Sequence, residues 1–479
     1  MYSLSLLGFT SFLIAFFLTP LARNWFRRHG IIDHPDQDRK LHNEAIPRIG
    51  GIVIAITYVL AFLVLLLSGL QAGSMVRGSL PVHWRLAPAA LLIFATGLID
   101  DLVGLKPWQK LIGQLSAAAT ACWAGVYIAG IDGHPLNIWL GIPITVIWLL
   151  ACTNAFNLID GVDGLAAGVG LFATITMLLA ALLQKNVPMA LATVPLAGAL
   201  LGFLRYNFNP ATIFLGDSGS LLIGFLLGCY GVLWSEKSAT ILGMTAPMMA
   251  LAIPLLDTTL AIVRRFLRQQ PIFTADRGHI HHRLLDKGFT PRKVALTLYA
   301  VAGLFAVLSL CTVWAPNVGL VLVLFCASTW VGIQHLGYVE FGVAGRMFVE
   351  GAFRRHLNTH IALKGFEEEL VAAGTLDDCW EIIKKASQEF GFRHIEMSLA
   401  GSIFQQRNGL DRGRCWNIRI PISQTDYVEL SREFEAPDQA GAVAPFADVL
   451  RKTLVPKLRV FETMADNIQP LARAASEGD

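Results

Sequence analysis

Eleven apolar stretches follow one another along the first 336 residues of the chain. They cover residues 4–22, 49–70, 86–99, 111–131, 136–153, 165–183, 187–204, 218–234, 239–263, 294–315 and 318–336. Most are long enough to cross roughly 30 Å of hydrocarbon as an α-helix. With 54% hydrophobic and 15% charged residues, the chain is too apolar for an ordinary soluble enzyme. The sequence therefore predicts an α-helical polytopic membrane protein with about 11 transmembrane helices.

Basic residues are concentrated in alternate loops between these stretches. The loops after the odd-numbered stretches, up to the ninth, contain Arg23, Arg27, Arg28, Arg39, Lys40, Lys106, Arg205, Arg264, Arg265, Arg268, Arg277, Arg283, Lys287 and Arg292. The opposite loops contain only Arg77, Arg85, Lys185 and Lys237. The positive-inside rule then predicts an outside N-terminus and cytoplasmic odd-numbered loops. The same concentration of positive charge suits anionic membrane lipids and a phosphorylated substrate.

The composition changes after about residue 340. The tail has a helix-like stretch, "TLDDCWEIIKKASQEFGF", three strand-like stretches, "HIEMSLA", "CWNIRIPI" and "YVELSREFE", and a last amphipathic stretch. These patterns predict a small cytoplasmic α/β domain, with a loose likeness to GAF-type sensor folds. The expected division is a membrane domain at 1–340, a juxtamembrane linker at 341–365, the α/β domain at 366–466 and a flexible tail at 467–479. The tail shows no catalytic constellation.

Polar residues gather where the apolar stretches reach the predicted cytoplasmic side. They are Asp100 and Asp101 after the third stretch, Asn154, Asn157, Asp160 and Asp163 after the fifth, Asp217 before the eighth, and His279, His281 and His282 after the ninth. Ionisable residues at membrane depth are costly and usually functional. One such residue alone is more often a helix cap, but capping hardly explains four separate loops that deliver them to one face. Asp257, within the ninth stretch, is expected to be a buried structural partner.

The stretch "TNAFNLIDGVDGL" places Asn154, Asn157, Asp160 and Asp163 three residues apart. This spacing puts neighbouring members on roughly one helical face, where carboxylate and amide oxygens can bind a hard cation. An EF-hand does not fit, because its acids stand at alternate positions with a closing Glu. The stretch "FLGDSGSLLIG" adds Asp217 at a helix start, where backbone N–H groups favour an anion, although it is no P-loop.

Five motifs resemble those of a known family. They are "DRKLHNEAIPRIGG", "GLIDDLVGLKPWQKLIGQ", "NAFNLIDGVDGLAAG", "FLGDSGSLLIG" and "RGHIHHRLLDKGF". In this order and on these sides they look like the polyprenyl-phosphate N-acetylhexosamine-1-phosphate transferases, over about residues 1–340. The H-I-H-H form looks like the bacterial enzymes that use UDP-GlcNAc to start cell-envelope glycans such as O-antigen. It is less like the phospho-muramyl-pentapeptide branch.

The resemblance implies a reaction and its partners. Undecaprenyl phosphate attacks the β-phosphorus of a UDP-amino-sugar, which gives a lipid diphospho-sugar and UMP. UDP-GlcNAc is the favoured donor, and UDP-GalNAc and UDP-FucNAc are the alternatives. The expected location is the bacterial inner membrane, with the active site and the tail in the cytoplasm. A homodimer is left open, and no nucleic-acid partner is expected.

The resemblance also assigns roles to residues. Asn157 and Asp217 are expected to hold Mg²⁺, with Mn²⁺ as an alternative, and Asp100 and Asp101 are the paired acids, acting as a base or organising the metal. Lys110 is expected to hold a phosphate. The other expected substrate contacts are Lys40, His42, Asn154, Asp160, Asp163, His279, His281 and His282. For the histidines, surface exposure or incidental metal binding is the alternative.

A transporter or flippase is an alternative of a different class. Such proteins also place acids in broken helices, but they gather them near the bilayer midplane, whereas here they gather at one face. A signalling receptor built around the tail leaves the membrane acids unexplained.

Overall fold

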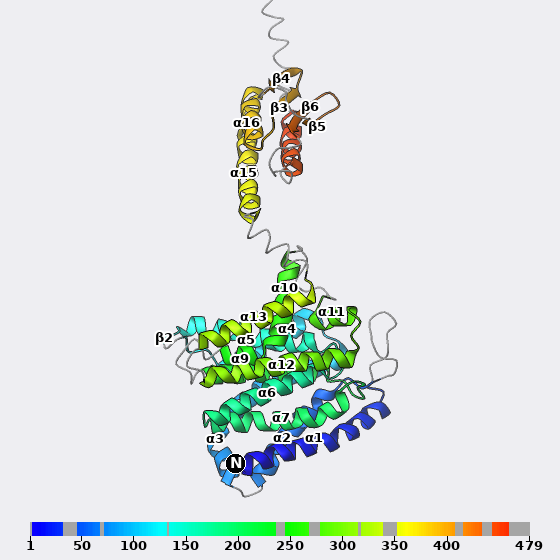
Figure 1. The fold of residues 1–479 in the computed structure, drawn as a ribbon, viewed down its shortest axis with the longest axis vertical. Coiled ribbons are helices and arrows are strands. Elements are labelled where there is room, and N and C mark those ends of the chain that lie inside the picture. The colour runs from blue at the N-terminus through cyan, green and yellow to red at the C-terminus, as the bar shows by residue number, and fades with distance from the viewer. Residues whose placement is uncertain are drawn as a thin grey trace, which may run out of the picture. The chain divides into compact units, whose positions relative to one another are not determined.

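A computed structural model describes most of the chain (Figure 1). The described residues are 2–31, 46–67, 71–131, 134–235, 245–267, 278–314, 318–338, 352–407, 415–433 and 443–458. Lys40, His42 and the predicted tail at 467–479 lie outside them. The chain divides into two compact units, Met1–Glu340 and Phe341–Asp479.

The first unit is almost entirely helical. Its helices are α1 Tyr2–Arg28, α2 Gly50–Leu67, α3 Gln71–Val103, α4 Pro107–Trp123, α5 Ile138–Ile159, α6 Leu165–Leu183, α7 Val187–Asn207, α8 Gly216–Ser235, α9 Thr245–Ala250, α10 Ala252–Leu267, α11 Ile280–Asp286, α12 Pro291–Trp314 and α13 Val318–Leu336. Two short strands, β1 Gly130–Ile131 and β2 His134–Pro135, form a hairpin between α4 and α5.

Nine of the helices in the described residues are long and apolar enough to cross a membrane, so the chain is an integral membrane protein. The prediction of eleven spans includes two segments that do not reach this length in the described part. The helix α4 has 17 residues. The described part of the stretch predicted at 239–263, from residue 245 onward, lies in two helices, α9 and α10, which meet at Leu251. The count of eleven therefore stays a prediction.

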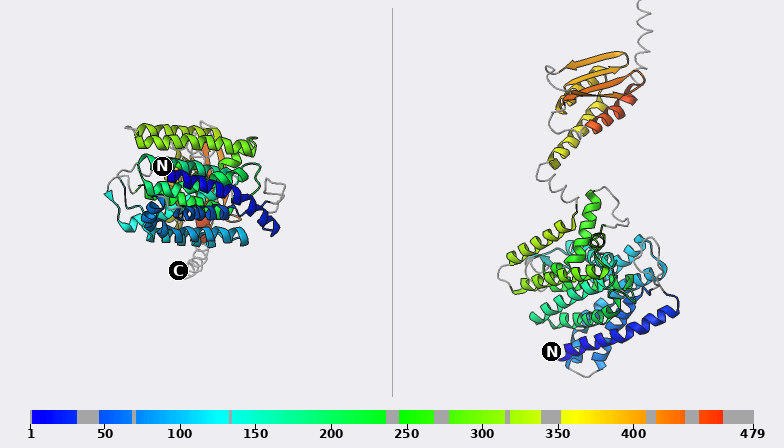
Figure 2. Two further views of the ribbon diagram at one scale, coloured as in Figure 1. Left: turned by 90° about the horizontal axis from the view of Figure 1, so that it is seen from below. Right: turned by 45° about the vertical axis from the view of Figure 1, so that its right-hand side comes forward.

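The long helices pack side by side, with α1 against α2 and α7, and α6 between α7 and α12 (Figures 1 and 2). The helix α8 is the most enclosed of the nine. Two glycines bring its neighbours close to its first turn, because a Cβ at Gly51 of α2 or at Gly97 of α3 would collide with the backbone of α8. The small residues therefore fix where the first turn of α8, and with it Asp217, lies within the bundle.

The second unit contains a four-stranded antiparallel sheet in the order β4-β3-β6-β5. Its elements are the helices α15 Ala352–Ala372 and α16 Leu376–Glu389, the strands β3 His394–Leu399, β4 Ser402–Arg407, β5 Cys415–Pro421 and β6 Tyr427–Glu433, and a helix over 443–458. The helices cover one face of the sheet (Figure 2) and bury a core that includes Leu370, Ile383, Met397, Val428 and Phe446.

Part of this unit was predicted from the sequence. The predicted helix and the three predicted strands are confirmed as α16, β3, β5 and β6, whereas β4 was not predicted. The helix α15 runs across the expected boundary between linker and domain at 365 and 366.

Candidate active site

The beginning of α8 is held in place by backbone pairing with the segment before α2. Phe214 N donates to Pro47 O at 2.8 Å, and Gly50 N donates to Phe214 O at 2.9 Å. Gly216, with a φ of +73°, then turns the chain into α8, a conformation that favours glycine. Asp217 and Arg48, which the sequence separates widely, are brought side by side by this pairing.

Asp101, at the end of α3, caps α8 from outside that helix. Its Oδ1 accepts the N–H of Asp217 at 2.7 Å, and its Oδ2 accepts the N–H of Ser218 at 2.9 Å. Its side chain is fully buried. Free N–H groups at a helix start attract a carboxylate, so Asp101 fixes the position of Asp217.

Asp217 lies at the centre of a charged cluster. Its Oδ1 accepts from Arg48 Nη2 at 3.1 Å and from Asn157 Nδ2 at 3.0 Å, and its Oδ2 accepts from Lys110 Nζ. The Asn157 amide also donates to Ser220 Oγ at 3.1 Å. The cluster thus joins α4, α5 and α8 with the segment before α2.

The ammonium group of Lys110 is surrounded by oxygens from three other helices. It lies 2.8 Å from Asp100 Oδ2 of α3 and 3.2 Å from Asn157 Oδ1 of α5, and it also contacts Asp217 Oδ2 of α8. Its side chain is only 17% exposed. The single positive charge of Lys110 is therefore surrounded by oxygens of two carboxylates and one amide.

Negative charge exceeds positive charge in this cluster. Three carboxylates, Asp100, Asp101 and Asp217, face two cations, Lys110 and Arg48. Asp160 follows α5 close by, and burial, together with the negative charge of Asp217, raises its pKa well above its ordinary value. An excess of partly desolvated negative charge is an environment that attracts a further cation.

The four members of the "TNAFNLIDGVDGL" ladder have different surroundings. Asn157 belongs to the charged cluster, while Asn154 exchanges two amide hydrogen bonds with Gln114 of α4, at 2.8 and 3.1 Å. Asp160 has no hydrogen-bond partner among the described residues. Asp163 Oδ2 accepts from Asn209 Nδ2 at 2.9 Å and from Ala211 N at 3.0 Å. The structure therefore brings Asn157 to the cluster and places Asp163 against the loop between α7 and α8.

The histidine motif is held by Asp257 of α10. Asp257 is buried, and it contacts His279 Nδ1 at 3.0 Å and accepts the N–H of Ile280, the first residue of α11, at 2.7 Å. The sequence predicts that Asp257 is a buried structural partner, and these contacts agree with that prediction. His281 packs against Gly161, beside Asp160, and against the ring of His282 at 4.3 Å. The motif thus adjoins the turn that follows α5.

Burial lowers the pKa of His281 from 6.5 to about 3, so the imidazole is neutral in the folded protein. In the unfolded chain it gains a proton below a pH of about 6.5, and protonation then favours unfolding. We expect the free energy of unfolding to fall by up to about 1.4 kcal/mol for each pH unit below that value. Melting temperatures at pH 7.5 and 5.5 should show a smaller decrease in His281→Gln than in the wild type. His335→Gln, at an exposed histidine, is the control. An equal decrease in His281→Gln and the wild type would contradict the prediction.

Three residues that contact predicted site residues were not predicted from the sequence: Arg48, Gln114 and Ser220. Arg48 lies within "DRKLHNEAIPRIGG", but nothing in that motif indicates that it contacts Asp217. The contact depends on tertiary structure, because the segment before α2 pairs with the residues before α8. The same holds for Gln114, since one amide in a helix gives no sign of its partner.

The chain matches the family profile "Glycosyl transferase family 4" over residues 83–235. It is 34% identical over 313 residues to the probable undecaprenyl-phosphate N-acetylglucosaminyl 1-phosphate transferase of Bacillus subtilis, covering 64% of this chain and 84% of the relative. It is 34% identical over 330 residues to the decaprenyl-phosphate N-acetylglucosaminephosphotransferase of Mycobacterium tuberculosis, covering 63% and 81%. It is 30% identical over 325 residues to the phospho-N-acetylmuramoyl-pentapeptide-transferase of Lactiplantibacillus plantarum, covering 64% and 96%.

Proposed function

Because this chain belongs to glycosyl transferase family 4, we propose that it transfers an N-acetylhexosamine 1-phosphate from a UDP-sugar to undecaprenyl phosphate. UDP-GlcNAc is the favoured donor, since two of the relatives are named as N-acetylglucosamine phosphate transferases. UDP-GalNAc and UDP-FucNAc are the alternatives. An oxygen of the lipid phosphate bonds to the β-phosphorus, the bond from that phosphorus to the bridging oxygen breaks, and UMP leaves with this oxygen.

One observation supports the proposal most strongly: the Lys110 ammonium lies within the oxygens of Asp100, Asn157 and Asp217. Phosphoryl transfer needs mainly positioning and neutralisation of charge. The cluster provides two cations for phosphate oxygens and, around one of them, oxygens that suit a metal ion. These are the two kinds of group that a diphosphate substrate requires.

The oxygen set fits Mg²⁺, with Mn²⁺ as an alternative. Within the described ranges, no three His, Cys, Asp or Glu side chains lie close enough together to hold a metal by themselves. Mg²⁺ needs fewer protein ligands, because it usually keeps several waters and binds one or two carboxylates together with substrate phosphates. Asp217, Asn157 and Asp100 would hold the ion where the Lys110 ammonium now lies. When bound, it would neutralise charge on the diphosphate.

The paired acids then have different roles. Both oxygens of Asp101 already accept backbone N–H groups of α8, so we assign it the positioning of Asp217. Asp100 bonds to Lys110 and to the N–H of Leu105, and it remains available to the metal and to the lipid phosphate. A phosphate monoester is largely ionised at neutral pH, which makes a separate base unnecessary.

The proposed orientation follows from the distribution of basic residues. The N-terminus lies outside, and the active site and the second unit lie on the cytoplasmic side of a bacterial plasma membrane, where UDP-sugars are available. Reporter fusions at Met1 and after Leu458 test this orientation.

The reaction is tested with the full chain in nanodiscs that contain undecaprenyl phosphate. A panel of UDP-GlcNAc, UDP-GalNAc, UDP-FucNAc and UDP-glucose is supplied, UMP is quantified and the lipid product is identified by mass. We expect UMP and a lipid diphospho-N-acetylhexosamine in equal amounts. Lipid or sugar transfer across the bilayer without UMP would refute the proposal and favour a transporter.

Arg48→Ala should lower kcat/KM by roughly 10- to 100-fold, because the guanidinium bridges two carboxylates and offers charge-assisted hydrogen bonds to phosphate. Arg48→Lys should recover only part of this loss, since an ammonium cannot reproduce the two-nitrogen contact. Arg28→Ala, at the exposed end of α1, is the matched control. UMP release at matched protein amounts measures the effect, and wild-type activity in Arg48→Ala would remove Arg48 from the site.

A further inference from the structure

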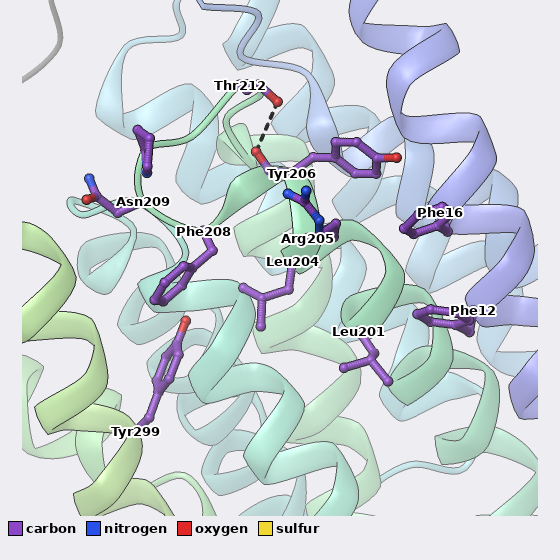
Figure 3. Close-up of a pocket in the computed structure, with 11 residues that line it drawn as sticks. Phe12, Phe16, Leu201, Leu204, Arg205, Tyr206, Phe208, Asn209, Thr212 and Tyr299 are labelled. Atoms are coloured by element: carbon purple, nitrogen blue, oxygen red, sulfur yellow. Dashed lines mark hydrogen bonds between the residues drawn. The ribbon is translucent and has the colours of Figure 1, made fainter.

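An apolar pocket of about 680 Å³ opens on the wall of the membrane unit, away from the charged cluster. Its lining comes from α1, from α7 and the loop that follows it, and from α12. Figure 3 shows Phe12 and Phe16 on one side, Phe208 and Tyr299 on the other, and Leu201 between them. The volume falls in the range of roughly 300–1,000 Å³ that is usual for small-molecule sites.

The pocket lies where membrane lipid is the surrounding solvent. The helices α1, α7 and α12 are all long and apolar enough to span the bilayer. Leu201 lines the pocket and is 50% exposed, so the pocket is open to the hydrocarbon. An acyl chain is therefore the apolar group available to fill it.

Positive charge lies at one end of this apolar lining. Arg205, in the last turn of α7, lines the pocket and is placed over the ring of Tyr206 at 5.9 Å. Arg292 does not line the pocket, but it lies over the ring of Phe208, which does, also at 5.9 Å. Neither arginine has an acidic partner among the described residues. The nearby carboxylate of Asp163 already accepts two hydrogen bonds, from Asn209 and Ala211.

An apolar pocket whose arginine, Arg205, has no acidic partner among the described residues matches an anionic lipid, since such a lipid joins an apolar chain to a phosphate. We propose that this pocket binds one anionic membrane phospholipid, with an acyl chain along Phe12, Leu201 and Tyr299 and its phosphate at Arg205.

The bound lipid is a resident one and not the reacting polyprenyl phosphate. Lys110, Asp100 and Asn157 belong to α4, α3 and α5, and none of these helices contributes to the pocket. A lipid whose phosphate is at Arg205 therefore does not present that phosphate to the charged cluster.

Two walls of the pocket nevertheless hold the turn that follows α5. The hydroxyl of Tyr299 donates to Gly164 O at 2.6 Å, and the loop at Asn209 and Ala211 donates to Asp163. A lipid that fills the pocket restricts these walls and, through them, the turn that contains Asp160. Binding should therefore raise turnover, a consequence that rests on the proposed function, whereas the binding itself does not.

Binding is tested by native mass spectrometry of the purified full chain after delipidation. Phosphatidylglycerol, phosphatidylcholine and undecaprenyl phosphate are the probes. We expect one phosphatidylglycerol for each chain, weaker retention of phosphatidylcholine, and a loss of affinity for phosphatidylglycerol of about tenfold in Arg205→Gln. Leu201→Trp, which fills the pocket without changing charge, should also weaken retention. Arg27→Gln, at the exposed end of α1, is the control and should bind like the wild type.

Three results would overturn the proposal. Equal retention of phosphatidylglycerol by the wild type, Arg205→Gln and Leu201→Trp would show that the pocket is not the binding site. Equal retention of the two phospholipids would show that negative charge is not recognised. Displacement of phosphatidylglycerol by an equal amount of undecaprenyl phosphate would assign the pocket to the acceptor substrate.

Activity is measured separately in nanodiscs of phosphatidylcholine with and without phosphatidylglycerol. The wild type should turn over faster with phosphatidylglycerol, and Arg205→Gln should not respond. If the wild type releases no UMP from any UDP-sugar, the proposed function fails while the binding result still decides the lipid site. If UMP is released but retention is unchanged in the variants, the lipid site fails alone.

Discussion

Replacing Asp217 with asparagine is expected to lower the rate of UMP release by roughly 10³-fold, a typical loss when one preorganised electrostatic group is removed from an active site. The carboxylate accepts from Arg48, Lys110 and Asn157 at once. An asparagine amide cannot accept at both positions, and it removes the charge that we assign to Mg²⁺ binding. The variant should therefore need a higher Mg²⁺ concentration to recover part of its activity.

The measurement is UMP release across a Mg²⁺ titration, with melting temperature as a test of folding. Asp286→Asn is the matched control, because Asp286 is an exposed aspartate at the end of α11. A folded Asp217→Asn protein with turnover close to that of the wild type would exclude Asp217 as a metal ligand and as the centre of the site.

The apolar stretches and their order predicted the helical membrane unit well, because each span needs only a local run of apolar residues. The interruption of the ninth stretch at Leu251 was not predicted, since the residues directly beside it, 248–253, are all apolar. The strand β4 was not predicted, because its sequence has too few apolar residues to show a strand pattern. "SIFQQR" has two apolar residues and lies at an exposed edge, and it depends on the turn at Ala400 and Gly401, both with positive φ.

The candidate site could be predicted by its residue types but not by its contacts. Acids, amides and one lysine at the ends of separate helices indicated a common site, and the structure brings Asp100, Lys110, Asn157 and Asp217 together. The cap that Asp101 forms on α8 spans more than 100 residues of chain, and no local pattern records such a pairing. The split of the ladder between the charged cluster and the loop at Asn209 likewise depends on tertiary packing.

Replacing Lys110 with alanine should separate the two effects of its ammonium group. One effect is binding of a substrate phosphate, and the other is competition with Mg²⁺. The ammonium lies among the same oxygens that we assign to Mg²⁺, so it competes with the ion when no substrate is bound. When substrate binds, it must move to a phosphate. We therefore expect kcat/KM to fall by roughly 10²-fold, because a charge-assisted hydrogen bond of about 1.5–3 kcal/mol is lost.

The Mg²⁺ concentration that gives half-maximal activity should move in the opposite direction, to a lower value, because Asp100 and Asp217 lose their competing cation and attract the metal more strongly. Lys106→Ala is the matched control: Lys106 is an exposed lysine just before α4, and it makes no contact with the cluster in the described residues. The values of kcat/KM and of the half-maximal Mg²⁺ concentration come from UMP-release titrations of the wild type, Lys110→Ala and Lys106→Ala. A higher Mg²⁺ requirement in Lys110→Ala would show that the lysine supports metal binding and does not compete with it. Equal losses in Lys110→Ala and Lys106→Ala would show that the ammonium among the three oxygens is not the phosphate ligand.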